Sequence, residues 1–251
     1  MTRLLLSVTL AAAVTVGLLS TATASPRDRV VLRAAVAGDF IDTDSRHQRV
    51  WRAWPRDRKA ILLGDIVHKN SPRRLWQREY APRWGSMPTC KVWSVLGNHG
   101  WGWSRGRWSP PARGRTYQEF RGSFHRQCPK AMGDRYQWVK RRPGWLLVGL
   151  NTENCQAATR LMRRATNRWP HRSVAVFTHR PPILPPGSKA PPLRCPGLTR
   201  LIDRKADLVM SGHSHRFWRQ GKYVVAGTGD GKGYVSLTLR RSGTWRADYK
   251  R

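Results

Sequence analysis

One pattern recurs along this chain: a short, continuous apolar run stops abruptly, and a polar residue of a type that can bind metal follows it. Five such runs are rich in Val, Ile, Leu and Ala and are bounded by Gly or other turn residues, so they are predicted to be buried β-strands. They are Val30 to Ala37, Ile61 to Leu63, Val92 to Leu96, Val174 to Thr178, and the LVMS run that begins at Leu208.

The polar residues after these runs form one set. The carboxyl ends of the strands in an open α/β sheet meet at one edge, where such folds place their ligand sites. Side chains that follow five strands are therefore expected to lie in one pocket. The set contains Asp39, Asp65, His68, Asn98, His99, His179, His213 and His215.

The rest of the chain predicts helices and further strands between these runs. Helices are expected over Gln156 to Trp169, where apolar residues recur with helical spacing, and from about Leu198 to Lys205. Three more are expected over Asp42 to Trp54, Pro72 to about residue 80, and Tyr117 to His125. A hairpin is predicted within Arg135 to Leu150, and antiparallel strands at Tyr223 to Ala226, Tyr234 to Leu239 and Trp245 to Tyr249.

Seven residues of the set have the chemistry of metal ligands. Carboxylates, an amide and imidazoles together form a mixed nitrogen and oxygen donor set, which suits Zn, Mn or Fe better than Ca or Mg alone. Four ligands saturate a tetrahedral zinc ion, so seven indicate two ions that share a bridging carboxylate. The seven are Asp39, Asp65, His68, Asn98, His179, His213 and His215.

The motifs around these residues resemble those of a known family. GD at 38–39, GDIVH at 64–68, GNH at 97–99, TH at 178–179 and GHSH at 212–215 are similar, in order and spacing, to the five motifs of calcineurin-like metallophosphoesterases. The resemblance implies an α/β (α+β) fold, a four-layer αββα sandwich of two mixed sheets flanked by helices. It spans nearly all of residues 25–251, which are expected to form one domain.

Within that family the chain resembles the purple acid phosphatase-like branch. A His is absent two residues after Asp39, where Ile41 stands, and the position of that branch's ligand Tyr holds His68. The resemblance implies that Asp65 bridges the two ions. Asp39, His68 and His215 would complete one site, and Asn98, His179 and His213 the other. Without the Tyr ligand, no purple charge-transfer colour is expected.

The chemistry implied is hydrolysis of a phosphate ester. Two cations polarise phosphoryl oxygens and lower the pKa of a bound water, so that hydroxide can attack phosphorus. The resemblance assigns His99 as the catalytic hydrogen-bond donor to the phosphoryl or leaving oxygen. Arg180, beside His179, is a further candidate for contact with the phosphate of the substrate.

The first 24 residues have the features of a secretory signal peptide. Arg3 precedes an apolar stretch from Leu4 to about Ser20, and Ala22-Thr23-Ala24 forms an A-x-A cleavage site. The alternative is a short membrane anchor, but the stretch is at the low end of the length that spans a bilayer. The expected product is a secreted or extracytoplasmic protein with no transmembrane segment after cleavage.

Four cysteines in an exported chain indicate two disulfides. Three connectivities are available. The pairing of Cys90 with Cys128 and of Cys155 with Cys195 is favoured, because each of these pairs flanks a separate long insertion.

Positive charge dominates the composition, with 47 Lys and Arg against 14 Asp and Glu and a formal net charge of +33. Such a surface should attract polyanions, nucleic acid included, although a codon bias toward Arg would produce the same composition. The segment Trp101 to Arg115, rich in Trp and Arg, is the best candidate for substrate contact. Three functions therefore remain: a phosphomonoesterase, a phosphodiesterase or nuclease of the same fold, and a catalytically weak polyanion-binding protein.

Overall fold

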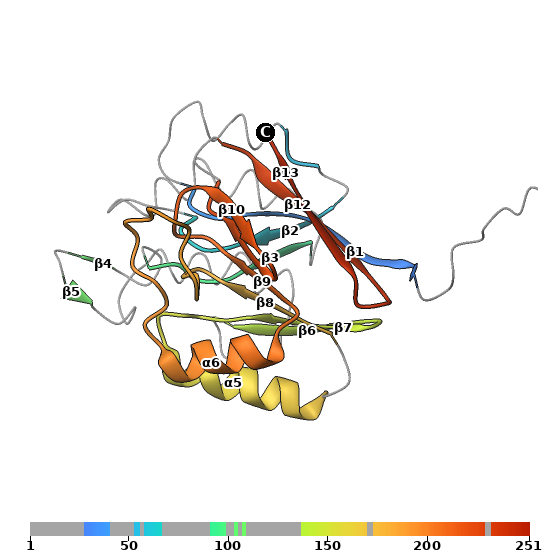
Figure 1. The fold of residues 1–251 in the computed structure, drawn as a ribbon, viewed down its shortest axis with the longest axis horizontal. Helices are drawn as coiled ribbons and strands as arrows, with labels where there is room; N and C mark the ends of the chain where they lie inside the picture. Colours follow the sequence, from blue (N-terminus) through green and yellow to red (C-terminus); the bar gives the residue numbers. More distant parts are fainter. Residues whose placement is uncertain are drawn as a thin grey trace, which may run out of the picture.

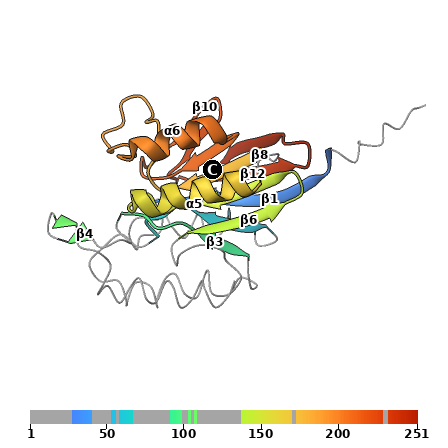
Figure 2. The ribbon, with the colours of Figure 1, turned by 90° about the horizontal axis from the view of Figure 1, so that it is seen from below.

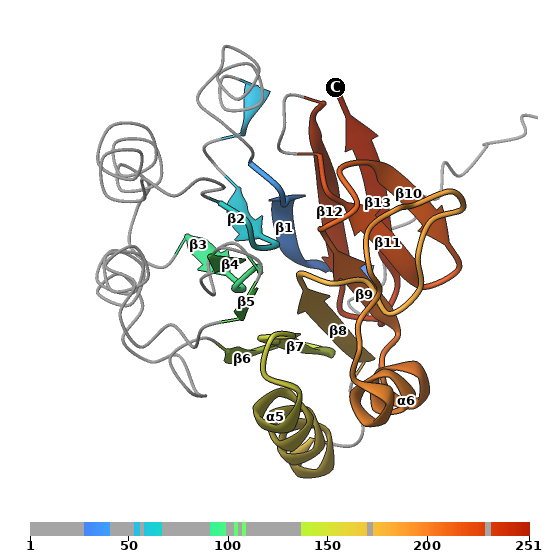
Figure 3. The ribbon, with the colours of Figure 1, turned by 90° about the vertical axis from the view of Figure 1, so that its left-hand side faces the viewer.

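A computed structural model describes residues 28–40, 53–55, 58–66, 91–98, 137–169, 173–228 and 232–251, and the backbone of 103–104 and 107–108. Its described part is built around two mixed β-sheets that face each other (Figures 1 and 3). The first sheet has the order β13-β12-β1-β2-β3 and the second has the order β10-β11-β9-β8-β7-β6.

The strands of the first sheet are β1 (Val30–Ala37), β2 (Lys59–Leu62), β3 (Val92–Ser94), β12 (Tyr234–Arg240) and β13 (Trp245–Lys250). Those of the second are β6 (Trp138–Arg142), β7 (Trp145–Gly149), β8 (Ser173–Thr178), β9 (Leu208–Ser211), β10 (Phe217–Gln220) and β11 (Tyr223–Ala226). β1, β2 and β3 are mutually parallel, as are β7, β8, β9 and β11. A small antiparallel pair, β4 (Trp103–Ser104) and β5 (Arg107–Trp108), stands apart from both sheets.

Two helices cover the outer face of the second sheet (Figures 2 and 3). They are α5 (Cys155–Arg168) and α6 (Pro196–Lys205). Helix α5 begins where the Asn154 side chain accepts a hydrogen bond from the backbone N–H of Ala157, and α6 begins with a proline in its first turn. Their apolar faces pack with β7, β8 and β9 into one buried cluster that includes Met162, Leu198 and Ile202.

The main core lies between the two sheets, and tryptophans join its two halves. Trp138 of the second sheet donates its indole N–H to the Ser94 carbonyl of the first at 2.8 Å, and Trp145 donates to the Arg240 carbonyl at 2.6 Å. Both rings are buried in the cluster that holds residues from both sheets. Buried indoles need a hydrogen-bond partner, and here the partner is the opposite sheet, so these contacts set the sheets' relative position.

The predicted fold class, with two mixed sheets, is confirmed. The five strands before the polar residues are present, as are the 138–149 hairpin and both helices that the periodicity predicts after residue 150. One expectation was wrong: β11 is not purely antiparallel, because it pairs in parallel with β9 and antiparallel with β10, a strand that the pattern did not predict. The helices expected at 42–54, 72–80 and 117–125 fall largely or wholly outside the described residues.

Candidate metal centre

Five strand ends bring six of the expected ligands together. Asp39 follows β1, Asp65 follows β2, Asn98 follows β3, and His179 follows β8; His213 and His215 lie in the turn after β9. Three of these strands belong to the first sheet and two to the second, so the site lies at one end of the sandwich, across both sheets. His68 and His99 lie outside the described residues.

The tightest group of ligand atoms belongs to Asp65, His179 and His213. One ligand atom from each of these side chains lies within 4.8 Å of the others. His179 Nε2 is 3.1 Å from Asp65 Oδ2 and 3.0 Å from His213 Nδ1, and it is 2.7 Å from Asn98 Oδ1. Asp65, His179 and Asn98 are buried.

Asp39 connects this group to His215. Its Oδ2 accepts a hydrogen bond from the backbone N–H of His213 at 2.6 Å, and its Oδ1 is 3.9 Å from His215 Nε2. Asp39 is fully buried, whereas the His215 side chain is about one third exposed. Asp39, just after β1, therefore contacts both His213 and His215 of the turn.

Glycines make room for the carboxylates. A Cβ on Gly97 would lie 2.1 Å from Asp65 Oδ1, and a Cβ on Gly227 would lie 2.6 Å from Asp39 Oδ2. Both distances are far below any real carbon-oxygen contact, so only glycine fits at either position. The GNH motif thus contributes Asn98 and also the space into which Asp65 points.

Backbone strain is concentrated at the same residues. Among the described residues, the only non-glycine residues with positive φ are Asp39, Asp65, His213 and His215, with φ between 47° and 69°. This left-handed conformation is unfavourable for a residue with a Cβ, although Asp and His adopt it more often than most. Strain of this kind persists where the surrounding structure holds it, and it clusters at functional sites.

The donor set fits a cation. His179 Nδ1 lies 2.8 Å from the Leu63 carbonyl and so carries its proton there, which leaves Nε2 of the neutral ring as an acceptor facing the oxygens of Asn98 and Asp65. Three mutually facing acceptors require a proton or a metal between them. Two ligand atoms bound at about 2.1 Å and at right angles to each other on one ion lie about 3.0 Å apart, close to the spacing seen here.

The pKa values of the two central histidines move in opposite directions. Burial acts to lower the pKa of His179, but the charge and hydrogen bond of Asp65, helped by Asp39 and the Leu63 carbonyl, outweigh it and raise the pKa to about 9. Burial also lowers the pKa of His213, and the nearby His179 and Arg180 lower it further, to about 2. In the absence of metal, one proton therefore resides on His179, at the position a cation would occupy.

The sequence matches the family model of the calcineurin-like phosphoesterases over residues 32–217. The chain belongs to the calcineurin-like phosphoesterase family. This match spans the five strand ends that hold Asp39, Asp65, Asn98, His179 and His213. A comparison with curated proteins found no match.

Solved structures share the fold of this chain. One is GAP50, described as the anchor in the inner membrane complex of Plasmodium, with a TM-score of 0.61, 14% sequence identity and coverage of 88% of this chain and 84% of that chain. Another is PhoD, with a TM-score of 0.55, 11% identity and coverage of 88% of this chain and 66% of that one. None of the described helices is long and apolar enough to cross a membrane.

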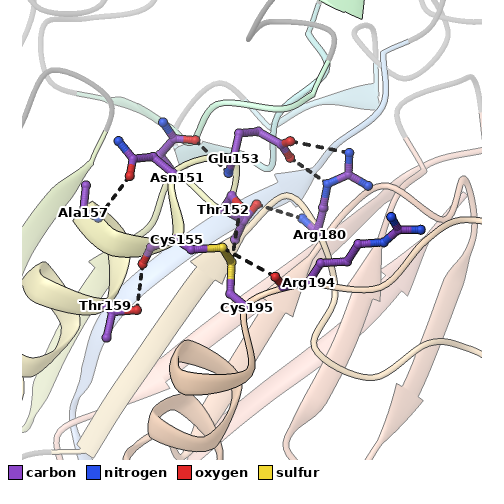
Figure 4. Close-up of a disulfide and its surroundings, with 10 residues drawn as sticks. Asn151, Thr152, Glu153, Cys155, Ala157, Thr159, Arg180, Arg194 and Cys195 are labelled. Atoms are coloured by element: carbon purple, nitrogen blue, oxygen red, sulfur yellow. Dashed lines mark hydrogen bonds and ion pairs between the residues drawn. A yellow bond between two sulfur atoms is a disulfide. The ribbon is translucent and has the colours of Figure 1, made fainter. Parts of the chain in front are cut away.

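Arg180 is held between Glu153 and His213, at the edge of the candidate metal centre. Its side chain is almost buried, and Nε donates to Glu153 Oε1 at 2.8 Å (Figure 4). Nη1 lies 2.9 Å from His213 Nε2. Glu153 was not among the predicted site residues. It follows β7 just as the candidate ligands follow their strands, and that position was the available signal.

A disulfide fixes the loop that carries Glu153. Cys155 and Cys195 are joined, with Cα atoms 5.6 Å apart, so the bond ties the start of α5 to the start of α6 (Figure 4). Beside it, the Thr152 hydroxyl accepts a hydrogen bond from the backbone N–H of Arg180 at 3.3 Å. One of the two favoured cysteine pairings is therefore confirmed, and the Cys90–Cys128 pairing lies outside the described residues.

Proposed function

We propose that the protein is an exported phosphoesterase that binds two metal ions at this centre and hydrolyses phosphomonoesters. The observation that carries the proposal is the convergence of Asp65, His179 and His213 on one point, with Asp39 and Asn98 beside them, in a member of the calcineurin-like phosphoesterase family. Zn, Mn and Fe all suit this nitrogen and oxygen donor set.

The residues divide into two groups in this proposal. Asp65 would bridge the two ions; Asn98, His179 and His213 would hold one of them, and Asp39, His68 and His215 would hold the other. The short distances from His179 Nε2 to Asn98 and Asp65 support the first group, and the contact between Asp39 and His215 supports the second. When bound, the ions would supply Lewis acidity for the phosphoryl oxygens and a water of lowered pKa.

The protein's own groups position the substrate. His99 donates a hydrogen bond to the phosphoryl or leaving oxygen, as its place directly after Asn98 in the motif implies. Arg180 contributes positive charge at the edge of the centre, held by Glu153 at 2.8 Å. If a neutral His213 binds a cation through Nδ1, its proton is on Nε2. Nε2 can then no longer accept a hydrogen bond from Arg180. Arg180 would then keep Glu153 and present Nη1 to the phosphate.

Export is supported by two independent features. The first 24 residues have the pattern of a cleavable signal peptide. The disulfide between Cys155 and Cys195 suits an oxidising compartment, because disulfides are rare in reducing cytosol. Mass spectrometry of the protein exported by its own host would reveal a new N-terminus at Ser25 if cleavage follows Ala24.

The test compares wild type with Asp65→Asn and Asp248→Asn. The two substitutions make the same chemical change, but Asp248 lies on β13, where it pairs with Arg246, away from the centre. Elemental analysis and turnover of a chromogenic phosphomonoester and of a bis-ester are measured on all three proteins. We expect about two metal ions per chain and monoester turnover in wild type and Asp248→Asn, with both strongly reduced in Asp65→Asn.

The other functions appear as distinct results of the same experiment. Faster turnover of the bis-ester than of the monoester would replace the proposal with a phosphodiesterase that uses the same centre. Absence of metal and of turnover in wild type, after incubation with Zn, Mn or Fe, would remove the enzyme proposal and leave a basic binding protein with this fold.

A further inference from the structure

Glu153 and Arg180 form an ion pair that is almost closed to solvent at the edge of the metal centre. Glu153 Oε1 lies 2.8 Å from Arg180 Nε, and the two side chains are 4% and 9% exposed. Burying two charges is costly because each loses its hydration, so a buried ion pair is weak evidence for a contribution to stability. The position and orientation of this pair point instead to a role at the neighbouring site.

Three neighbouring parallel strands place Glu153, Arg180 and His213 in a row. β7, β8 and β9 lie side by side, and the three residues follow them at the same edge of the sheet. Arg180 is the middle member and comes directly after the candidate ligand His179. The carboxyl ends of parallel strands are where sheets of this kind bind their ligands. The ion pair is therefore part of the edge at which the metal centre lies.

Two contacts with one carboxylate set the orientation of the Arg180 guanidinium group. Nε donates to Glu153 Oε1 at 2.8 Å, and Nη2 lies 3.5 Å from Oε2 of the same carboxylate. A fork of two contacts fixes the plane of a guanidinium group, which a single contact does not. The third nitrogen, Nη1, is thereby directed away from Glu153 and toward His213 Nε2, 2.9 Å away. Glu153 thus determines which nitrogen of Arg180 faces the candidate ligands.

The segment that carries Glu153 is itself held in place. The backbone N–H of Glu153 donates to Asn151 Oδ1 at 3.1 Å. The Thr152 hydroxyl accepts from the backbone N–H of Arg180 at 3.3 Å, so the two segments are also joined beside the ion pair (Figure 4). The disulfide that ties α5 to α6 begins two residues after Glu153. A carboxylate on a segment fixed in this way can keep its partner in one orientation before a ligand arrives, which lowers the cost of binding.

We infer that Glu153 is a positioning residue that acts on the substrate only through Arg180, by holding the guanidinium group so that Nη1 faces the phosphate bound at the metal centre. The inference rests on the proposed function in that it requires the centre to bind phosphate. It predicts an effect opposite in sign to that of charge alone. Removing a negative charge beside an anion site should strengthen anion binding, whereas removing a positioning carboxylate should weaken it.

The test compares Glu153→Gln with wild type in the metal-loaded protein, with inorganic phosphate as the probe and titration calorimetry as the readout. Gln keeps the length of the side chain but lacks its charge and its second acceptor oxygen. We expect the affinity for phosphate to fall about tenfold, as for the loss of one charge-assisted hydrogen bond. kcat/KM for the chromogenic monoester should fall by about 10–100-fold, because a displacement of about 1 Å costs that much. Metal content should stay as in wild type.

Two controls separate positioning from charge and from a general loss of structure. Asp203→Asn makes the same chemical change in another ion pair, in which Asp203 lies 3.5 Å from Lys222, and this variant should bind phosphate as wild type does. In an Arg180→Gln background, Glu153→Gln should change the affinity by no more than about twofold, because the residue through which it acts is gone. Phosphate affinity equal to or above that of wild type in Glu153→Gln would overturn the inference, as would an equal loss in the Arg180→Gln background.

A second variant covers the case in which Glu153→Gln does not fold. Glu153→Asp keeps the charge but shortens the side chain by one methylene group, which withdraws the carboxylate from the fork. It should also weaken phosphate binding, and wild-type affinity in this variant would overturn the inference. A wild-type protein that binds phosphate without ester turnover would remove the proposed function alone, since calorimetry needs no chemistry. A wild-type protein that binds no phosphate would overturn the inference as well.

Discussion

Replacing Gly97 with alanine should disable the metal centre without changing any ligand. Gly97 lies between β3 and Asn98, and its missing side chain leaves the space that the Asp65 carboxylate occupies. A Cβ at this position would lie 2.1 Å from Asp65 Oδ1 and 2.3 Å from the Asp65 backbone nitrogen. Real Cβ atoms are essentially never closer than 3.0 Å to another heavy atom, so something must move by about 1 Å.

Neither side of this contact can move at low cost. The Asp65 backbone is already in the left-handed conformation, with a φ of 47°, and the Phe40 N–H donates to its carbonyl at 2.9 Å. On the other side, Gly97 packs against Gly64, where a Cβ would lie 2.7 Å from the Gly97 Cα. Overpacking of this kind costs about 1–3 kcal/mol of stability. A displacement of about 1 Å at a reacting centre costs on the order of 100-fold in rate.

The assay measures metal content, kcat/KM for a phosphomonoester and the thermal midpoint of Gly97→Ala beside Gly197→Ala. Gly197 lies in the first turn of α6, where an added Cβ meets nothing within 4 Å. This control should retain metal and activity and gain a little stability, because alanine restricts the unfolded chain more than glycine does. Wild-type metal content and kcat/KM in Gly97→Ala would refute the view that the Gly97 space holds Asp65 in its ligating position.

Three further predictions concern pH, the disulfide and a helix cap. In the metal-free protein, the pKa of His179 is raised from 6.5 to about 9. The protonated His179 side chain therefore contributes on the order of 3 kcal/mol to the free energy of unfolding below pH 6.5. Thermal unfolding scans should show this contribution lost as the pH rises to 9. The lowered pKa of His213 acts below that range, where stability should be lost as the pH falls below 6.5. A midpoint that rises steadily from pH 6.5 to 9 would contradict the His179 prediction, and a midpoint that rises as the pH falls below 6.5 would contradict the His213 prediction. Replacing Cys155 and Cys195 together by Ser should cost about 2–4 kcal/mol in urea unfolding, since the bond closes a 40-residue separation, and an unchanged midpoint would count against it. Asn154→Ala should cost about 1 kcal/mol by removing the α5 cap, whereas Asn154→Asp should not.

Much of the fold could be predicted because its signals are local. The apolar runs that became β1, β2, β3, β8 and β9 are short, are bounded by turn residues and are buried almost throughout, so periodicity and composition both identify them. Helix α5 has its apolar residues on one face, and only this face is buried. Strand β10 was missed because its FWRQ sequence is half exposed at the edge of the sheet and shows no alternation.

The candidate site was predictable as a list of residues and not as a network. Strand ends meet at an edge, so the chain pattern indicates that Asp39, Asp65 and His179 lie close together, but it does not indicate which atoms face each other. The contact of Glu153 with Arg180 joins residues 27 apart in sequence, and that of Arg180 with His213 joins residues 33 apart. Both depend on the packing of β7, β8 and β9 side by side, which no local signal contains.

The distribution of positive charge bears on whether the excess of arginine has a function. A codon bias would scatter arginine over exposed positions where any polar residue is tolerated, and α5 fits this description, with Arg160, Arg163 and Arg164 all exposed. It would not place Lys59 and Lys140 in partly buried positions next to Arg142, because burial and repulsion lower the pKa of each lysine and so oppose folding in the charged state.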